Sequence, residues 1–200
     1  MDSAEIAKYL DDEYPETPAV LPKEVRAYQV GPIHTLFTLW RKSDVQHFDP
    51  QAAFDHVFWE FAGTALLPLF IYRQLALLQP ASQPYWRLTR EAWFGGVKLE
   101  DACPPEKYAE RWAEAERVYG LIASWLDSAG DGRITFLGGD LVVDGKPRVT
   151  HADLSVATGL LWMRTVCGAD SEEWKMVKGW HGGRWKRLLD VLEPFRLVPS

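Results

Sequence analysis

The chain has 200 residues, a formal net charge of -6 and a hydrophobic fraction of 47%, with 10 tryptophans. These values fit one sizeable helical domain with a short extra element. Basic and acidic residues are interspersed without a long run of either sign, which argues against nucleic acid and anionic membranes as partners. The sequence has neither a signal-peptide pattern nor a stretch apolar enough to span a membrane, so we expect a soluble cytoplasmic protein.

Two cysteines and five histidines are the residues that would suggest a metal site. Cys103 and Cys167 lie far apart, and neither they nor the histidines match a zinc-ligand spacing. We predict structural thiols and no metal. The chain also has no Gly-x-Ser-x-Gly elbow and no phosphate-loop glycine spacing, which argues against hydrolase and nucleotide-binding functions.

The N-terminal part begins with a short helix. Ser3 is a suitable N-cap, and Pro15 stops the helix twelve residues later. The helix is short and needs a surface to pack on. Residues 15–24 contain three prolines and no period, which indicates a linker. The structure of residues 25–40 is left open.

A long helix follows Pro50, which suits a first helical position. Apolar residues recur at helical spacing over residues 51–78, with a bend expected near Pro68. Residues 85–94 form the next helix, expected to lie antiparallel to the first.

Pro104 and Pro105 open an amphipathic helix with a well-defined apolar stripe. The connection after it contains two glycine–aspartate steps. It forms either a hairpin between residues 134–136 and 141–143 or a loop.

Thr150 and Asp153 have the Thr-x-x-Asp spacing of a capping box. The helix that they start, over residues 154–166, is apolar almost all round, which is typical of a helix inside a bundle. Two last helices are predicted over residues 171–180 and 184–195, with two glycines between them. The sum is an all-α bundle of about five to seven helices.

Four patches resemble the glutathione S-transferase family, most of all its fungal branch related to bacterial lignin β-etherases. Their order is also the family's order. They are the acidic-Ser pair and Tyr-Pro end of residues 2–15, the aromatic and Arg-Glu stretch of 85–95, the segment of 136–154 with its Ala-Asp pair, and the tryptophan-rich 174–185.

The resemblance implies an all-α fold, namely a glutathione-transferase C-terminal-domain-like helical bundle preceded by one helix left from a thioredoxin-like domain. Residues 1–22 would be that helix and its linker, residues 23–48 an extra segment, and residues 49–200 the helical domain. In the family, the thioredoxin-like domain supplies a catalytic Ser, Cys or Tyr. Most of that domain is absent here, so no catalytic residue is assigned, and whether Met1 is the natural start is left open.

The family's acidic-Ser pair binds glutathione, and only Asp2 and Ser3 match it. A helix N-terminus and a hydroxyl can hold a carboxylate while an acid pairs with an ammonium group. The resemblance therefore implies a weak glutathione site, and the alternative is that both residues merely cap the helix.

An acceptor pocket for an aromatic molecule is the second implied site. We assign to it four aromatic residues, and the alternative is that they belong to the core: Phe58, Trp59, Tyr72 and Trp93. Arg90 and Glu91 are interpreted as an ion pair that tethers two helices or belongs to a site.

Two functions follow from the resemblance. One is a glutathione-transferase-like protein that conjugates glutathione to aromatic small molecules or cleaves their ethers. The other is a non-catalytic module that binds a hydrophobic ligand, a protein partner or a second copy in a homodimer.

Overall fold

The fold is described from a computed structural model of the chain. The residues that it describes are 3–17, 19–21, 50–136, 142–143, 146–147 and 149–193. Side chains are not described at 3–5, 50–53, 55–57, 142–143 and 146–147. The predicted extra segment, residues 23–48, lies outside the described residues.

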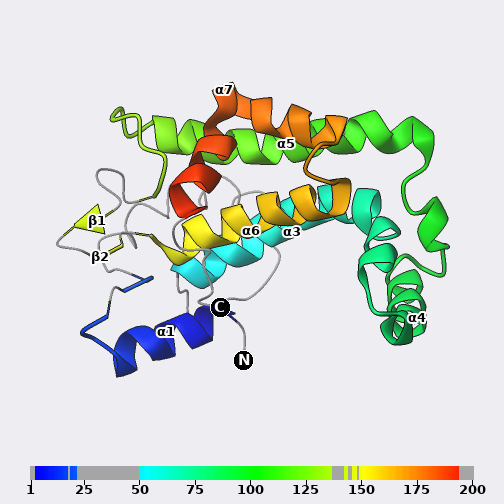
Figure 1. Cartoon of the computed structure of the whole chain (residues 1–200), viewed down its shortest axis with the longest axis horizontal. Helices are drawn as coiled ribbons and strands as arrows, with labels where there is room; N and C mark the ends of the chain where they lie inside the picture. Colours follow the sequence, from blue (N-terminus) through cyan, green and yellow to red (C-terminus); the bar gives the residue numbers. More distant parts are fainter. Residues whose placement is uncertain are drawn as a thin grey trace.

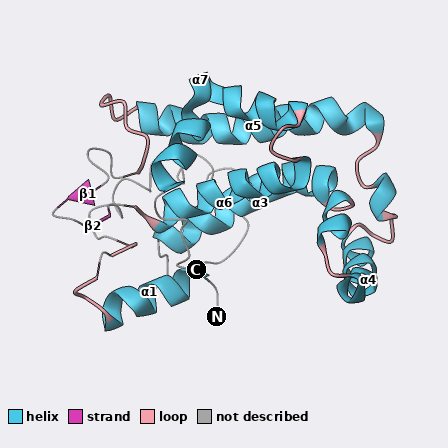
Figure 2. Cartoon of the chain, viewed as in Figure 1, coloured by secondary structure: helices cyan, strands magenta, loops and turns pink. Residues whose placement is uncertain are grey.

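Four helices form the core of the molecule (Figures 1 and 2). They are α3 (Pro50–Phe70), α5 (Pro105–Asp127), α6 (His151–Cys167) and α7 (Glu172–Leu192). α3 packs against α5 and α6, and α7 packs against the same two helices. The first helix, α1 (Ser3–Glu13), packs on α3. Among the described helices, none is long and apolar enough to cross a membrane.

The centre of this bundle is built around Tyr119 of α5, which is fully buried. The rings of Phe58, Trp180 and Trp185 surround it, with centroids 5.7, 5.8 and 5.2 Å away. Gly159 of α6 makes room for the ring, because a Cβ at this position would lie 2.5 Å from the Tyr119 hydroxyl. The lack of a side chain at Gly159 therefore leaves the space that the Tyr119 hydroxyl occupies against α6.

Among the side chains described on α1, Ala7 is buried, and the carboxylate of Asp11 binds the segment that follows the helix. The two oxygens of Asp11 accept hydrogen bonds from the amides of Val20 and Leu21, at 3.0 and 2.8 Å. The carbonyl of Val20 in turn accepts the amide of His151 at 2.8 Å. The segment after α1 is thereby fastened to the first turn of α6.

The long helix predicted over residues 51–78 is shorter than expected. α3 ends at Phe70, two residues after Pro68, and the chain continues as the 3-10 helix η2 (Arg73–Leu77). Proline has no amide hydrogen and restricts the turn before it. The apolar residues after Pro68 continue at helical spacing, so a prediction from this spacing alone made the α-helix too long.

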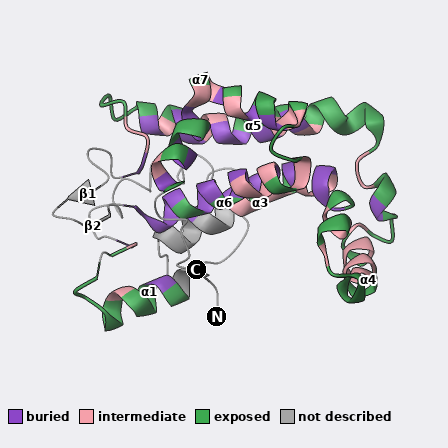
Figure 3. Ribbon diagram, viewed as in Figure 1, coloured by how far each residue is buried: buried purple, intermediate pink, exposed green. Residues whose placement is uncertain are grey.

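The next helix, α4 (Gln83–Trp93), belongs to a unit that projects from one end of the bundle (Figure 1). This α4 unit, residues 73–101, consists of η2, η3 (Pro80–Ser82), α4 and η4 (Leu99–Asp101). α4 packs against these short helices instead of along α3, so the expected antiparallel pairing with α3 is wrong. α4 has no buried residue (Figure 3).

The connection between α5 and α6 contains a minimal hairpin. β1 (Val142–Val143) pairs antiparallel with β2 (Lys146–Pro147). Of the two alternatives left open for this connection, the hairpin between residues 134–136 and 141–143 is wrong, because residues 142–143 pair with residues 146–147. Phe136 is not paired with a strand, because its amide donates to the Asp153 carboxylate at 2.9 Å.

α7 is interrupted where the sequence predicts a break. Residues 180–183 leave the helical conformation, and His181, Gly182 and Gly183 have φ values of 50°, 67° and 74°. The indole N–H of Trp185 donates to Nδ1 of His181 at 2.8 Å and fixes the turn. The two halves of α7 consequently point in different directions (Figure 1).

Candidate functional site

The start of α1 is the place of the predicted glutathione site. The helix begins at Ser3, so its first amides are free of helical partners and can bind an anion. Asp2 lies outside the described residues, and the side chain of Ser3 is not described.

The start of α6 has the predicted capping box. The Thr150 hydroxyl accepts the amide of Asp153, and an Asp153 oxygen accepts the Thr150 amide at 2.9 Å and the Thr150 hydroxyl at 2.7 Å. The other Asp153 oxygen accepts the amide of Phe136. Burial raises the pKa of the Asp153 carboxyl to about 6, although these three hydrogen bonds oppose the rise. Asp153 therefore joins a loop to a helix and faces no open site.

Two of the four predicted acceptor residues lie together. Phe58 is 2% exposed and belongs to the core, and Trp59 is half-buried beside it with a centroid distance of 5.2 Å. Trp59 also meets Trp162 of α6, another half-buried ring, at 6.3 Å. Trp59 and Trp162 thus form an aromatic pair between α3 and α6, beside the buried Phe58.

The other two predicted acceptor residues, Tyr72 and Trp93, lie at the far end of α3. Tyr72 is 49% exposed next to η2, and Trp93 is 64% exposed on α4. Twelve residues of helix separate Phe58 from the end of α3 at Phe70, a rise of roughly 18 Å. The structure thus divides the predicted set into a core residue and its half-buried neighbour, Phe58 and Trp59, and an exposed pair, Tyr72 and Trp93.

Arg90 does not form the predicted ion pair with Glu91. Its guanidinium lies over the rings of Trp86 and Trp93, at 4.3 and 3.8 Å from their centroids. Stacking of a guanidinium on indole faces is a favourable arrangement. Trp86 is itself anchored by its indole N–H, which donates to the carbonyl of Ile71 at 3.3 Å.

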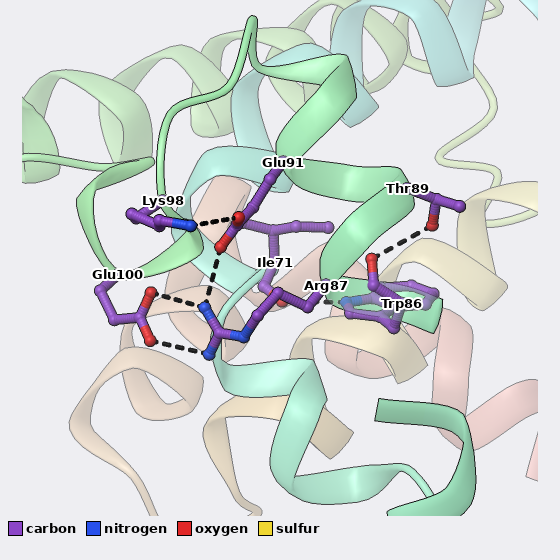
Figure 4. Close-up of polar contacts among 7 residues, drawn as sticks. All are labelled: Ile71, Trp86, Arg87, Thr89, Glu91, Lys98 and Glu100. Carbon is purple, nitrogen blue, oxygen red and sulfur yellow. Dashed lines mark hydrogen bonds and ion pairs between the residues drawn. The ribbon is translucent and has the colours of Figure 1, made fainter. Parts of the chain in front are cut away.

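Glu91 takes part in a different network, drawn in Figure 4. Arg87 donates to Glu91 at 2.9 Å and to both oxygens of Glu100, and Lys98 donates to the second oxygen of Glu91 at 2.8 Å. The hydrogen bonds from Arg87 lower the pKa of the Glu100 carboxyl to about 2. The network closes the α4 unit on itself and leaves none of these four charges for a ligand.

The two cysteines are poor nucleophiles. Burial raises the pKa of the Cys167 thiol to about 11, and burial also raises the pKa of Cys103. Cys167 accepts a hydrogen bond from Arg73 at 3.6 Å, and Arg73 pairs with Glu173 at 2.8 Å. Neither thiol is ionised near neutral pH, so neither is suited to covalent catalysis.

Described residues line two open clefts among others. One lies between α3 and α5 with a volume near 600 Å³, and Phe61, Ala65 and Arg111 are among its lining residues. The other, near 540 Å³, lies between the end of α6 and both halves of α7. Neither of these two clefts is lined by a predicted acceptor residue. Among the described residues, no group of three His, Cys, Asp or Glu side chains could hold a metal ion.

Trp162 is the residue that sequence reasoning missed. It lies in a helix that is apolar on almost every side, so its spacing does not distinguish a core position from a partly open one. The sequence signal for this contact lies on α3, where Trp59 is off the helical stripe that the buried residues Phe54 and Phe58 form.

Comparison with known proteins identifies relatives of this fold. A family model described as "Glutathione S-transferase, C-terminal domain" matches residues 50–195. Among solved structures, the glutathione S-transferase CsGST63524 of Ceriporiopsis subvermispora, in complex with glutathione, is 36% identical with a TM-score of 0.78. The alignment covers 100% of this chain and 67% of that one.

Two further structures are similar. CsGST83044 of the same organism, also in complex with glutathione, is 32% identical with a TM-score of 0.72, covering 97% of this chain and 66% of that one. The glutathione transferase GSTFuA3 of Phanerochaete chrysosporium is 29% identical with a TM-score of 0.74, covering 100% and 66%. The chain thus spans about two thirds of the length of these relatives. A comparison with curated proteins found no match.

Proposed function

Because the chain belongs to the glutathione S-transferase family, we propose that it binds glutathione and an aromatic small molecule. Its proposed reaction is to conjugate glutathione to that molecule or to cleave an ether bond in it. The observation that carries this proposal is the likeness, at 36% identity over the whole chain, to a transferase crystallised with glutathione. The proposed location is the cytoplasm.

The glutathione site is proposed at the start of α1. The free amides of the first turn and the Ser3 hydroxyl would bind the carboxylate of the γ-glutamyl group, and Asp2 would pair with its ammonium group. These groups contact one end of the tripeptide only, so the expected affinity is weak. No described residue is assigned to activating the glutathione thiol.

The acceptor site is proposed at Trp59, with Phe58 behind it and Trp162 facing it. The Trp59–Trp162 pair is half-buried, so it can offer ring surface to a ligand without being solvated on all sides. Tyr72 and Trp93 remain a second, exposed option on the α4 unit. A comparison of matched tryptophan variants distinguishes the two options.

The test is a turnover assay with chlorodinitrobenzene and with a β-aryl ether, each in the presence of glutathione. Replacement of Trp59 by Phe should lower kcat/KM for the aromatic substrate several-fold, since ring area is lost at the stacking surface. Trp93→Phe is the matched control and should leave kcat/KM unchanged. If only Trp93→Phe lowers it, the acceptor site lies on the α4 unit instead.

The alternative function is a non-catalytic ligand-binding or protein-interaction module, in which a second copy could be the partner. Exposed apolar side chains on two helices favour it. They are 40% or more exposed on α1 at Ile6, Tyr9 and Leu10, and on α4 at Tyr85, Leu88 and Trp93. Absence of turnover with both substrates, together with a dimer in light scattering that Leu88→Glu dissociates, would favour this alternative.

A further inference from the structure

The turn of α7 depends on a histidine in a backbone conformation that favours glycine. His181 has φ 50° and ψ 45°, and within the described part of the chain it is the one residue other than glycine with a positive φ. Gly182 and Gly183 follow in the same region, where glycine meets no hindrance from a Cβ. A Cβ disfavours this conformation, so contacts of the imidazole must hold His181 in place.

One of these contacts requires a neutral imidazole. The indole N–H of Trp185 can only donate, and it donates to Nδ1 of His181 at 2.8 Å. Nδ1 must therefore have a free lone pair, and the proton of the ring lies on Nε2. Protonation of the ring would place a hydrogen on Nδ1 as well, so that two N–H groups would face each other. The hydrogen bond and the imidazolium are therefore incompatible.

The imidazole is wedged between α5 and its own helix. Its Nε2 edge lies against α5, because a Cβ at Gly120 would lie 2.9 Å from Nε2. Its ring meets the ring of Trp185 edge to face, with the centroids 5.8 Å apart. Trp185 is 1% exposed and packs in turn on Tyr119. Separation of two facing N–H groups would therefore require the turn itself to move.

Charges on α5 and α7 act on this imidazole. Glu116 and Asp127 of α5 favour the imidazolium, and Arg184 of α7 opposes it. Asp127 is paired with Arg184, which offsets part of its effect on His181. Arg187 adds a second cation at the turn, where it donates to a backbone carbonyl at 2.7 Å. Burial is the largest influence, and it holds the pKa of His181 below the ordinary value of 6.5.

We propose that the turn of α7 is an acid-sensitive switch, in which protonation of His181 at Nδ1 breaks the hydrogen bond from Trp185 and loosens the second half of the helix. The proton is taken up from solvent. In the open turn the imidazole is hydrated and has its ordinary pKa, whereas in the closed turn its pKa is lower. The closed turn is therefore fully stable above pH 6.5 and loses stability as the pH falls through the lower pKa. The switch is independent of the proposed transferase function.

The test is hydrogen–deuterium exchange of the whole chain at pH 7.5 and at pH 5.0, with rates corrected for the intrinsic pH dependence of exchange. Protection of residues 180–187 should fall roughly fivefold or more on acidification, because the open turn binds a proton that the closed turn excludes. His181→Asn should remove most of this change. Its side-chain oxygen can accept from Trp185, asparagine tolerates a positive φ, and the amide does not titrate. Asp153 titrates over the same range, and comparison of the two proteins cancels its contribution.

Two tryptophan variants isolate the hydrogen bond. Trp185→Phe keeps a ring but loses the donor, so the pKa of His181, followed by NMR titration, should rise towards 6.5. Trp180→Phe is the matched control, because the Trp180 indole N–H is buried without a hydrogen-bond partner among the described residues. It should leave the pKa of His181 unchanged.

Thermal unfolding at pH 7.5 should show that these three variants are folded. The proposal is overturned if acidification leaves the wild-type protection of residues 180–187 unchanged, or if His181→Asn loses protection as much as the wild type. It is also overturned if the pKa of His181 is the same in Trp185→Phe as in the wild type.

Discussion

The four-helix core and the α4 unit are held together by different interactions. In the core, Tyr119 and Trp185 are 0% and 1% exposed and pack ring against ring. In the α4 unit, α4 buries no residue, and its links are polar: the ion pairs of Arg87 and Lys98, and the hydrogen bond from the Trp86 indole to the carbonyl of Ile71. Apolar burial dominates folding free energy, and exposed ion pairs contribute little. The core should therefore determine global stability, and the α4 unit should open locally without unfolding it.

The largest expected effect comes from filling the space beside Tyr119. In Gly159→Ala, the new Cβ would lie 2.5 Å from the Tyr119 hydroxyl and 3.3 Å from Phe58. Overpacking of this kind should lower the free energy of unfolding by about 3 kcal/mol or more, measured by urea denaturation. Gly179→Ala is the matched control, because nothing lies within 4 Å of its Cβ position, and it should be neutral or slightly stabilising.

A second variant sharpens this prediction. The Tyr119 hydroxyl is buried without a hydrogen-bond partner among the described residues, so Tyr119→Phe alone should be neutral or stabilising by about 1 kcal/mol. In the double variant Gly159→Ala, Tyr119→Phe, the closest contact of the new Cβ disappears. Partial recovery of stability is expected, and strictly additive effects would contradict the proposed clash.

The next effect is a pH dependence that originates at Asp153. Burial raises its pKa in the folded chain to about 6, above the ordinary value of 3.8. The folded state then binds more protons between these pH values, so this contribution to stability is present below pH 3.8 and is lost as the pH rises through 6. The loss should be at most about 3 kcal/mol.

Asp153→Asn removes this titration, so the pH dependence should be measured for both proteins by chemical denaturation from pH 3.5 to 7. The wild type should lose stability relative to the variant as the pH rises. If the hydrogen bonds from Thr150 and Phe136 outweigh burial, the folded pKa lies below 3.8, and the wild type gains relative stability with rising pH. That outcome would contradict the assignment.

A smaller effect on stability is expected from glycine-to-alanine substitutions, and it should differ between the four-helix core and the α4 unit. Gly168 ends α6 with a φ of 96°, and Gly95 follows α4 with a φ of 68°. Alanine is strained at both positions, and at both nothing lies within 4 Å of the new Cβ. Gly168→Ala should lower the global free energy of unfolding by about 1 to 2 kcal/mol, whereas Gly95→Ala should only increase amide exchange in α4.

The smallest effect is expected from Arg87→Met. It breaks the contacts with Glu91 and Glu100 but retains the aliphatic stem. Hydrogen–deuterium exchange should become faster in α4, while the midpoint of thermal unfolding stays unchanged within error. A clear fall in that midpoint would mean that the α4 unit and the core unfold together.

Much of the architecture could be predicted from the sequence. The all-α fold and the family, including its fungal branch, are confirmed by the family model and the solved relatives. Rules for capping and helix breaks predicted the structure correctly where the interacting residues are close in the sequence. Thr150 and Asp153 are three residues apart, and residues 180–183 contain the two glycines at which α7 turns.

The errors arise where the outcome depends on distant contacts. An apolar period continued past Pro68 and did not distinguish an α-helix from the 3-10 helix at Arg73. Arg90 has both a carboxylate and two indoles within reach along α4, and only the packing of the α4 unit decides that it stacks on Trp86 and Trp93. Likewise, the partner of Trp59 is a tryptophan about a hundred residues later, and no local pattern encodes that contact.

The most direct test of the functional account is calorimetric titration of the chain with reduced glutathione. The account predicts a dissociation constant from micromolar to low millimolar, about -8 to -4 kcal/mol, that Ser3→Ala weakens about tenfold. Ser171→Ala removes the N-cap serine of α7, whose hydroxyl accepts the amide of Trp174 at 3.0 Å, and should leave glutathione binding unchanged. No detectable heat at millimolar glutathione, or equal binding by wild type and Ser3→Ala, would contradict a glutathione site at the start of α1.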